Sequence, residues 1–341
     1  HNWAGRGKIS KRGEKKLIRT PIDTTLRMTS RYQHSVVLCT AGYDHTIKFW
    51  EAPAGKCYRT LQFSDSQVNK LAITPDKQYL AAVGNCHARL FDVMKDVSMP
   101  VRTFQGHSGN ITAVGFQKDR KWMFTGSEDG TLKIWDMRQR SGFQRSYPSK
   151  AAINTAALHP NQGEIISGDE DGNIRVWDLT ANACSYELVP DGKCAIRSIT
   201  IAPDASLVMA ANNRGTCFIW KLNDSSTAHS DVAFRPLHKI EAHDTYCLKA
   251  LISPDVKYLA TTSADKTIKI WNISKKFELE KTLVGHQRWV WDCCFSADSQ
   301  YLVSASSDMS AKLWKLGTGN VLMEYKGHQK AVTCVALNDN N

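Results

Sequence analysis

The 341-residue chain lacks the long apolar runs, paired cysteines and phosphate-binding loops that mark several large classes of protein. No uninterrupted apolar stretch approaches the roughly 18–20 residues that a membrane-spanning helix needs, so we expect no integral membrane segment. With no Cys-x-x-Cys pair and no His/Cys cluster at zinc spacing, we expect no metal site. Neither a glycine-rich phosphate loop nor a nucleophile elbow is present, so the sequence predicts no enzyme activity, no cofactor and no small-molecule substrate.

The chain has little excess basic charge outside its first residues, although its formal net charge is +11. Residues 1–27 carry eight Lys or Arg against Glu14 and Asp23, a net +6, which leaves +5 for all the rest. We expect residues 1–31 to be a basic extension, either disordered or a translated leader, and residues 32–341 to form the folded part. The alternative, a basic head that binds nucleic acid, predicts that deleting residues 1–27 abolishes binding. We favour the first interpretation and expect no nucleic-acid partner.

The cysteines indicate a reducing compartment. Six of the ten lie within strand-like patterns, where they act as small apolar residues: Cys39, Cys217, Cys247, Cys293, Cys294 and Cys334. Thiols used in this way are typical of proteins of the cytosol or nucleus, where cysteines stay reduced.

The chain does contain one stretch that recurs seven times. In residues 257–271, KYLATTSADKTIKIW, an apolar run ends in small residues, turns at an Asp and closes on a Trp. The copies end at Trp50, Phe91, Trp135, Trp177, Trp220, Trp271 and Trp314, which lie 41, 44, 42, 43, 51 and 43 residues apart. In five copies a turn Asp lies six residues before the Trp: Asp44, Asp129, Asp171, Asp265 and Asp308. A period of this length is typical of a repeat architecture.

Short strands separated by turn residues every eight to twelve positions or so favour an all-β array with four strands in each repeat. The ends are out of phase with the repeat, because the chain enters at a second strand, Val36–Thr40, and its last element, Val332–Leu337, is a first strand. Pairing the two would close the ring and remove its exposed sheet edges. The sequence therefore predicts an all-β, seven-bladed β-propeller, closed by pairing of the C-terminal strand with the N-terminal blade. We interpret the polar residues 223–236 as a mobile loop between blades five and six.

Buried polar networks are predicted in four of the blades. A His can bond the turn Asp, while a Ser or Thr four residues before that Asp joins the His to the Trp indole N–H. The predicted tetrads are His328, Thr40, Asp44 and Trp50; His107, Thr125, Asp129 and Trp135; His243, Thr261, Asp265 and Trp271; and His286, Ser304, Asp308 and Trp314. The combination resembles a catalytic triad, but its recurrence and its burial against Trp favour a structural role.

Blades two, four and five lack this set of residues. Asn85 and Arg214 replace the turn Asp, and Ser149 and Gly192 fall at the His position. We expect these blades to depend more on packing and to form the softer side of the ring.

A protein-binding face is predicted where the first strands begin. The side chains expected there are Trp289 and Trp291 in blade seven, Tyr246 and Leu248 in blade six, Gln67 and Asn69 in blade two, and Tyr43 beside the turn Asp of blade one. Aromatic side chains with amide neighbours are the composition of an interface hot spot. The alternative is that these aromatics only cover the neighbouring blade.

The Gly-His, Trp-Asp and turn-Asp pattern resembles WD40 repeats over residues 36–338. Within that class, AGYDHTIKFW (41–50), DSQVN (65–69), LHPNQ (158–162), WVWDCCFSADSQYLVSASSD (289–308) and GHQKAV (327–332) resemble the small WD40 subunit of the target-of-rapamycin (TOR) kinase complexes. The resemblance implies a non-catalytic scaffold that binds the C-terminal lobe of a TOR-type kinase domain and other TOR complex subunits. It also implies a cytoplasmic protein, which reaches endomembrane surfaces through its complex.

Other WD40 functions stay open as alternatives. Trp135-Asp136-Met137-Arg138 resembles the Trp-Asp-x-Arg signature of substrate receptors of cullin-RING ubiquitin ligases, although so short a match is weak. A generic protein-interaction scaffold is a further alternative. A G-protein β-type subunit would need an amino-terminal coiled coil, and residues 1–35 show no heptads.

Overall fold

The computed structural model describes residues 36–138, 142–222 and 234–340. Strands, turns and bends account for these residues, and no helix occurs among them. None of the described segments is a helix that is long and apolar enough to cross a membrane. The predicted all-β fold is therefore confirmed.

The strands form four-stranded antiparallel blades, numbered here in the order of the repeats. Blade one combines Val332–Asn338 (β27), Val37–Gly42 (β1), Thr46–Glu51 (β2) and Lys56–Gln62 (β3). Blades two and three share one long strand, Arg102–Phe116 (β7). Blade two combines the first half of β7 with Lys70–Ile73 (β4), Tyr79–Val83 (β5) and Asn85–Asp92 (β6). Blade three combines the second half with Trp122–Ser127 (β8), Thr131–Asp136 (β9) and Arg145–Pro148 (β10). Blade four holds Ile153–Leu158 (β11), Glu164–Asp169 (β12), Ile174–Asp178 (β13) and Ala183–Leu188 (β14).

The remaining blades repeat the same order of strands. Blade five holds Ile196–Ile201 (β15), Leu207–Asn212 (β16), Thr216–Leu222 (β17) and Phe234–Glu241 (β18). Blade six holds Cys247–Ile252 (β19), Tyr258–Ser263 (β20), Thr267–Asn272 (β21) and Glu278–Val284 (β22). Blade seven holds Val290–Phe295 (β23), Tyr301–Ser306 (β24), Ser310–Lys315 (β25) and Asn320–Lys326 (β26).

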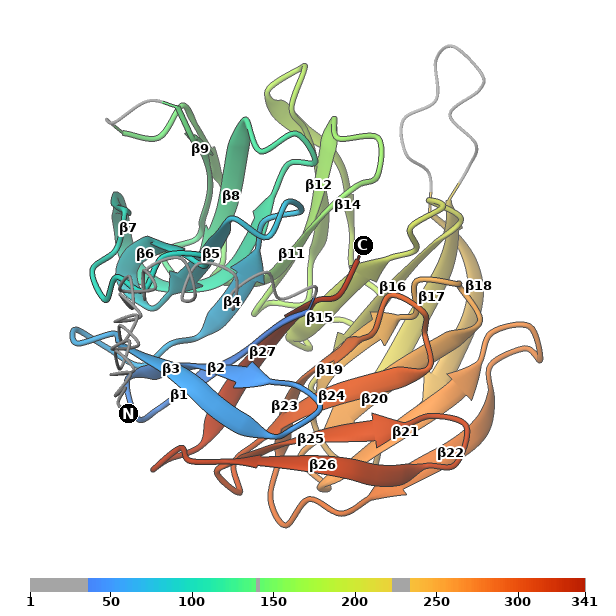
Figure 1. Cartoon of the computed structure of the whole chain (residues 1–341). Helices are drawn as coiled ribbons and strands as arrows, with labels where there is room; N and C mark the ends of the chain where they lie inside the picture. The colour runs from blue at the N-terminus through green and yellow to red at the C-terminus, as the bar shows by residue number, and fades with distance from the viewer. Residues whose placement is uncertain (1–35, 139–141, 223–233, 341) are drawn as a thin grey trace, which may run out of the picture. The chain divides into compact units, whose positions relative to one another are not determined.

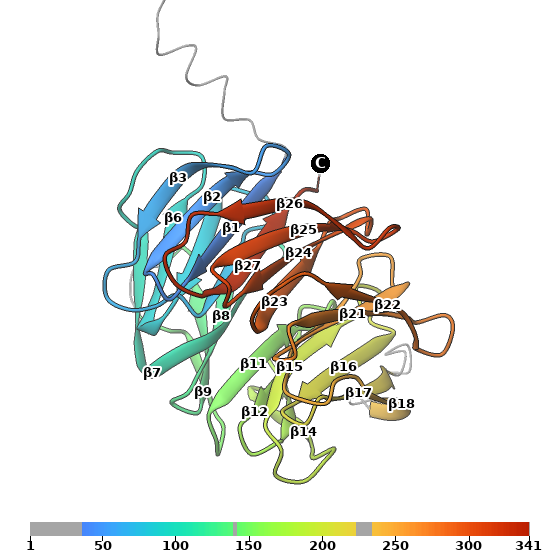
Figure 2. The same ribbon diagram turned by 90° about the horizontal axis from the view of Figure 1, so that it is seen from below.

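The last strand pairs with the first. β27 runs antiparallel to β1 with Leu38 opposite Leu337 and Thr40 opposite Val335, and the two lie side by side as the red and blue ends of the chain in Figures 1 and 2. The first strands of successive blades also contact one another in a cycle, from β27 through β4, β7, β11, β15, β19 and β23 back to β27. This is the arrangement of a seven-bladed propeller that is closed by its last strand.

The hydrophobic core lies between neighbouring blades. One cluster joins Ile47 and Phe49 of blade one to Leu71, Leu80 and Phe91 of blade two, and all five side chains are buried. A strand that packs against a neighbour on both of its faces is apolar on both, which explains the nearly continuous apolar runs of the second strands.

Two elements differ from the sequence prediction. The expected first strand of blade three, residues 111–116, is the second half of β7, because the outer strand of blade two continues into it through Gly106 at φ +146°. The interpretation of residues 223–236 as a loop between blades five and six was wrong. Phe234 pairs with Leu222 and begins β18, so the insertion lies inside blade five, and residues 223–233 lie outside the described ranges.

Candidate protein-binding face and central channel

The four predicted tetrads come together in the structure. In blade three, His107 Nδ1 lies 2.8 Å from Asp129 Oδ2 and its Nε2 lies 2.7 Å from Thr125 Oγ1, which accepts the Trp135 indole N–H at 2.8 Å. The same three contacts join His243, Thr261, Asp265 and Trp271, and also His286, Ser304, Asp308 and Trp314. The fourth tetrad joins the two ends of the chain through His328, Thr40, Asp44 and Trp50.

The histidines of these networks are sealed from solvent. The four His side chains are at most 1% exposed, so no substrate can reach them, which supports a structural role. Burial alone would raise the pKa of Asp129, but hydrogen bonds from Thr131, the Ser108 N–H and His107 outweigh it and lower the pKa to about 2. Burial likewise acts against the hydrogen bonds from His243 and Thr267 at Asp265, whose pKa falls to about 2.

Blade four builds a different network. Its Trp177 donates to Ser167 Oγ at 2.7 Å, but Arg175 takes the place of the histidine and donates to Asp169 and, at 2.7 Å, to Ser149 Oγ. Both charged side chains are at most 4% exposed. The turn residue Asp171, which the repeat pattern aligned with the tetrad carboxylates, is exposed and takes no part.

A belt of hydrogen bonds joins successive first strands around the channel. Side chains near the start of one blade's first strand donate to carbonyl oxygens of the next blade: Thr333 to Val68 (2.6 Å), Asn69 to Ile111 (3.0 Å), Thr112 to Ile153 (2.5 Å), Asn154 to Ile196 (3.1 Å) and Ser198 to Ala250 (3.2 Å). Asn69, predicted to bind a partner, therefore also uses its side-chain N–H within the fold.

Next to blade seven, contacts between charged side chains take the place of these hydrogen bonds. Asp292 on β23 accepts a hydrogen bond from Lys70 Nζ on β4 at 2.7 Å and from the Val335 N–H on β27 at 3.3 Å. Lys249 Nζ on β19 lies 4.0 Å from the other carboxylate oxygen. Sequence reasoning missed this trio because its members come from three blades that only ring closure brings together. The one sequence signal was that Lys70 and Lys249 directly follow the predicted partner-binding residues Asn69 and Leu248.

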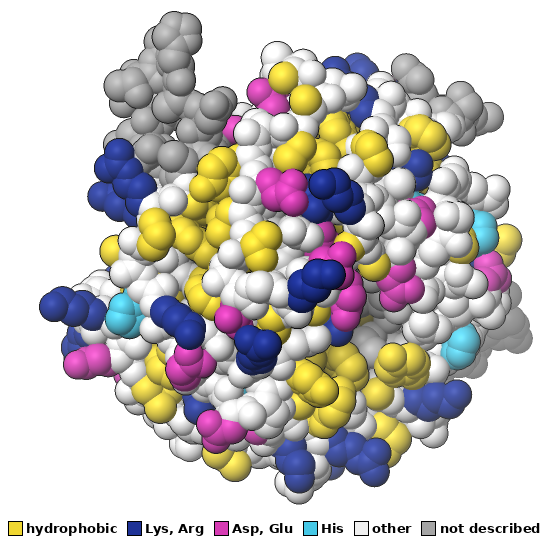
Figure 3. All heavy atoms as spheres, turned by 180° about the vertical axis from the view of Figure 1, so that it is seen from behind, with side chains coloured by type: hydrophobic (Ala, Val, Ile, Leu, Met, Phe, Trp, Pro, Cys, Tyr) yellow, Lys and Arg dark blue, Asp and Glu magenta, His cyan; other side chains and the backbone are white. Residues whose placement is uncertain are grey.

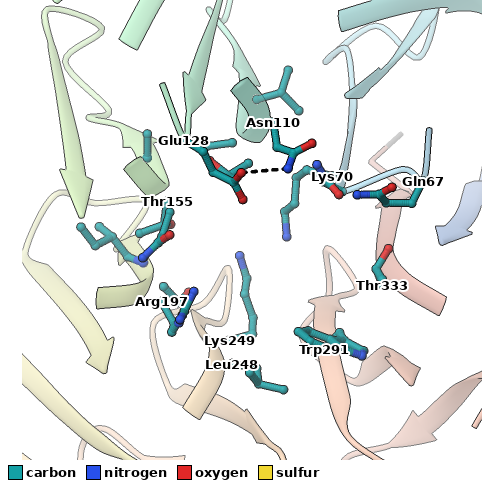
Figure 4. A pocket seen from close by; sticks show the side chains of 18 of the residues that line it. Gln67, Lys70, Asn110, Glu128, Thr155, Arg197, Leu248, Lys249, Trp291 and Thr333 are labelled. Atoms are coloured by element: carbon teal, nitrogen blue, oxygen red, sulfur yellow. Dashed lines mark hydrogen bonds between the residues drawn. The ribbon is translucent and has the colours of Figure 1, made fainter. Parts of the chain in front are cut away.

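The channel opens into a cavity of about 400 Å³. Five of the seven predicted partner-binding residues line it: Tyr43, Gln67, Asn69, Leu248 and Trp291. Figure 4 shows Gln67, Leu248 and Trp291 around the rim, with Lys70 and Lys249 pointing towards each other across the middle. The structure therefore brings most of the predicted face to the mouth of the channel.

The other two predicted residues, Tyr246 and Trp289, lie beside this mouth. Together with Trp291 they form a row of rings that we call the aromatic ridge. The ring centroids of Tyr246 and Trp289 are 6.0 Å apart, and those of Trp289 and Trp291 are 5.5 Å apart. Tyr246 is 47% exposed and Trp289 41%, whereas Trp291 is half-buried and donates its indole N–H to Ser307 Oγ at 2.6 Å. The contact between Tyr246 and Trp289 bridges two blades, yet both rings still present apolar area to solvent.

The charges of the described residues are mixed. On the face shown in Figure 3, Lys and Arg are interspersed with Asp and Glu, and no stripe of basic side chains runs across it. This face of the described residues therefore presents no continuous basic patch. Among the described residues, no cluster of His, Cys, Asp and Glu could hold a metal ion.

Five segments of the chain match the WD40 family (WD domain, G-beta repeat): residues 55–92, 98–136, 142–178, 234–272 and 277–315. These segments cover more than half of the chain, and each runs from the outer strand of one blade through the first three strands of the next. Fold and repeats together define a WD40-repeat protein.

Full-length relatives narrow the class further. The chain is 58% identical over 257 residues to "Target of rapamycin complex subunit LST8-1" of Arabidopsis thaliana, covering 75% of this chain and 83% of that protein. It is 52% identical over 308 residues to "Target of rapamycin complex subunit wat1" of Schizosaccharomyces pombe, covering 90% and 97%. It is 45% identical over 312 residues to "Target of rapamycin complex subunit LST8" of Rattus norvegicus, covering 89% and 95%. The chain belongs to the LST8 family of WD40 proteins, as its motifs predicted.

Proposed function

We propose that this chain is a non-catalytic subunit of a TOR kinase complex, in which it binds the C-terminal lobe of the kinase domain and stabilises the active site. The binding surface is the channel mouth together with the aromatic ridge. In this proposal a rigid β-propeller holds a protruding element of the kinase and performs no reaction. It acts in the cytoplasm, or at endomembrane surfaces that the complex reaches.

The observation that carries this proposal is the exposed aromatic ridge beside a polar channel mouth, in a chain whose relatives are named as TOR complex subunits. Aromatic side chains that are half-exposed in the free protein gain the most from burial in an interface, because they bring a large apolar area at a low cost in side-chain entropy. The sealed histidines support a non-enzymatic role, because in all four tetrads the histidine of the triad-like arrangement is inaccessible.

The test is the double substitution Trp289→Ala and Trp291→Ala. We expect it to abolish co-purification of the TOR kinase from cells while the purified variant keeps a cooperative thermal transition. The matched control is Val97→Ala with Met99→Ala, which removes apolar side chains that are 49% and 71% exposed in the connection after β6. Unchanged kinase recovery with the tryptophan variant would show that the assigned face is wrong.

The ubiquitin-ligase alternative receives less support. Its candidate residue Arg138 is exposed, but its guanidinium donates to Asp136 two residues before it, at 2.9 Å and 3.0 Å, so the pair is already matched. Identification of the proteins that co-purify with the chain separates the two functions directly.

A further inference from the structure

The mouth of the channel contains an ammonium group that has no hydrogen-bonded counter-ion among the described residues. Lys70 donates a hydrogen bond to Asp292 at 2.7 Å, and this carboxylate is 3% exposed. Lys249 has only the 4.0 Å approach to the same carboxylate, and its ammonium makes no hydrogen bond to any of the described residues. The Asp292 oxygen that faces Lys249 has no hydrogen-bond partner among them either. Two cations therefore share one carboxylate.

The environment of Lys249 disfavours its charge. Burial and the neighbouring Lys70 charge lower the pKa of Lys249 to about 8, against the opposing effect of Asp292. A buried ammonium without close hydrogen bonds gains strongly when an anion reaches it, because little water must be displaced and the local dielectric constant is low. Lys249 points into the cavity, where Figure 4 shows open space between it, Lys70 and Glu128.

We propose that the channel mouth receives the carboxylate of an Asp or Glu side chain from the protein partner, paired with Lys249, while apolar residues of the same segment pack on the aromatic ridge. The inference rests on the proposed function, because it takes the partner to lie on this face. Leu248, which precedes Lys249, lines the same cavity as Trp291 of the ridge, so one short segment can reach both.

The charges around the site favour a carboxylate over a phosphate. Among the described cations that line the cavity, Lys249 is the one without a hydrogen-bonded carboxylate, and a single partner carboxylate can pair with it. Glu128 lines the same cavity and bonds Asn110 at 2.8 Å, so it would repel a doubly charged phosphate more strongly. Arg197 is already paired with Glu170 at 3.3 Å and with Asn213 at 2.6 Å.

The central test is Lys249→Met, with Lys249→Arg as the control that keeps the charge. Methionine preserves the length and apolar stem of lysine, and it removes a charge that the fold does not fully satisfy, so we expect the melting temperature to stay the same or rise. Binding to purified TOR kinase that lacks this subunit should weaken at least tenfold for the Met variant, because the partner's carboxylate is then buried without a cation. The Arg variant should bind within about threefold of the unsubstituted protein, because Arg pairs well with a carboxylate.

The pH dependence of binding tests the same pairing without any substitution. As pH rises from 7 to 9, Lys249 loses its proton and the affinity should fall, whereas the Arg variant should show a flat profile over this range. The charged or titratable groups that face Lys249 are Lys70 from β4, Asp292 and Cys293 from β23, Arg197 from β15 and Glu128 after β8. Burial raises the pKa of Cys293 to about 12, so its thiol does not titrate in this window.

The outcomes separate this inference from the proposed function. Normal binding by Lys249→Met, with loss of binding by the double tryptophan variant, would overturn the carboxylate pairing and leave the function standing. Normal binding by both variants would overturn both. Treating the kinase with a phosphatase should leave binding unchanged, and loss of binding after this treatment would show that the anion is a phosphate and that the proposal is wrong.

Discussion

Four blades of this propeller carry the His–Ser/Thr–Asp–Trp tetrad and three do not, yet all seven are built from four antiparallel strand segments, with β7 shared by blades two and three. In the tetrad blades (one, three, six and seven), a histidine just before the first strand or, in blade three, within β7 contacts the turn Asp and the Ser or Thr of the second strand, and that hydroxyl also accepts the Trp indole N–H of the third strand. In the variant blades (two, four and five), other side chains make the polar contacts at the corresponding position. The tetrad is therefore one way to fix the loop between blades, and not a requirement of the fold.

The variant blades differ among themselves. Blade four replaces the His–Asp pair with a buried Arg175–Asp169 ion pair that also reaches Ser149, the residue at the histidine position. Blade five uses Asn212, whose side chain accepts two backbone N–H groups and donates to Asp191 at 3.0 Å. Blade two has Phe91 in place of Trp, and the Ser66 hydroxyl accepts the Asn85 N–H at 2.9 Å. The prediction that all three variant blades are less stable than the tetrad blades therefore has the least support in blade four.

The largest effect should follow from removing residues 328–341, which breaks blade one. This deletion removes both the β27–β1 pairing and the histidine of the tetrad that joins the termini. It also takes Val332 and Val335 out of an apolar cluster and so exposes the rest of it, including Leu38 and Trp50. Because a whole domain is typically stable by only about 5–15 kcal/mol, we expect no cooperative unfolding transition at all. The control is deletion of residues 1–27, which should leave the melting temperature almost unchanged. Equal melting temperatures for the two deletions would refute closure by β27.

The second effect tests whether blade four is soft. Arg175→Met leaves Asp169, which is 1% exposed, without its cation, and breaking a buried pair in this way costs about 3–5 kcal/mol. Lys133 occupies the equivalent position in blade three, two residues before Trp135. It donates to Ser146 at 3.2 Å and lies 3.7 Å from the centroid of the Phe143 ring, and it leaves no buried carboxylate unpaired when it is removed. Lys133→Met should therefore cost less, about 1–2 kcal/mol. Chemical denaturation of both variants measures the difference, and equal costs would mean that the arginine network adds nothing.

The sequence predicted the features that recur from blade to blade, such as the tetrads, but not those that occur in a single blade. Three of the tetrads could be found because each lies within one repeat, at a spacing that strand pairing converts into contact, and the fourth because the same residue types stand at the two ends of the chain that ring closure joins. The Arg175–Asp169 pair could also have been predicted from the repeats. Two residues before the Trp, the tetrad blades have Lys48, Lys133, Lys269 and Lys312. Blade four alone combines an Arg at this position with an Asp eight residues before the Trp.

The repeat pattern could not predict contacts between blades. The trio of Lys70, Asp292 and Lys249 depends on how three first strands pack around the channel, and no periodicity encodes that packing. The same holds for the insertion in blade five. Its polar residues resemble an inter-blade loop, and only the pairing of Phe234 with Leu222 shows that the outer strand comes after it.

The smallest expected difference is between two serines at the same position of the second strand. Ser304 in tetrad blade seven accepts from the Trp314 indole at 2.8 Å and lies 2.7 Å from His286 Nε2, whereas Ser167 in variant blade four accepts only from Trp177. Ser304→Ala therefore leaves two buried groups unsatisfied and Ser167→Ala leaves one. At about 1–3 kcal/mol for each, we expect a loss of about 2–6 kcal/mol for the first variant and about 1–3 kcal/mol for the second.

The serine pair sharpens the comparison because both substitutions delete the same hydroxyl from a fully enclosed strand, so the difference between them reports the tetrad histidine alone. The free energy of unfolding, measured in denaturant at neutral pH, gives both values. Adding His286→Phe to the Ser304→Ala variant should recover part of the loss, because the orphaned imidazole is then replaced by a side chain with no polar group to satisfy. If the two alanine variants were equally stable and the added phenylalanine only destabilised further, the histidine would contribute packing and not hydrogen bonding, and the distinction between tetrad and variant blades would lose its energetic basis.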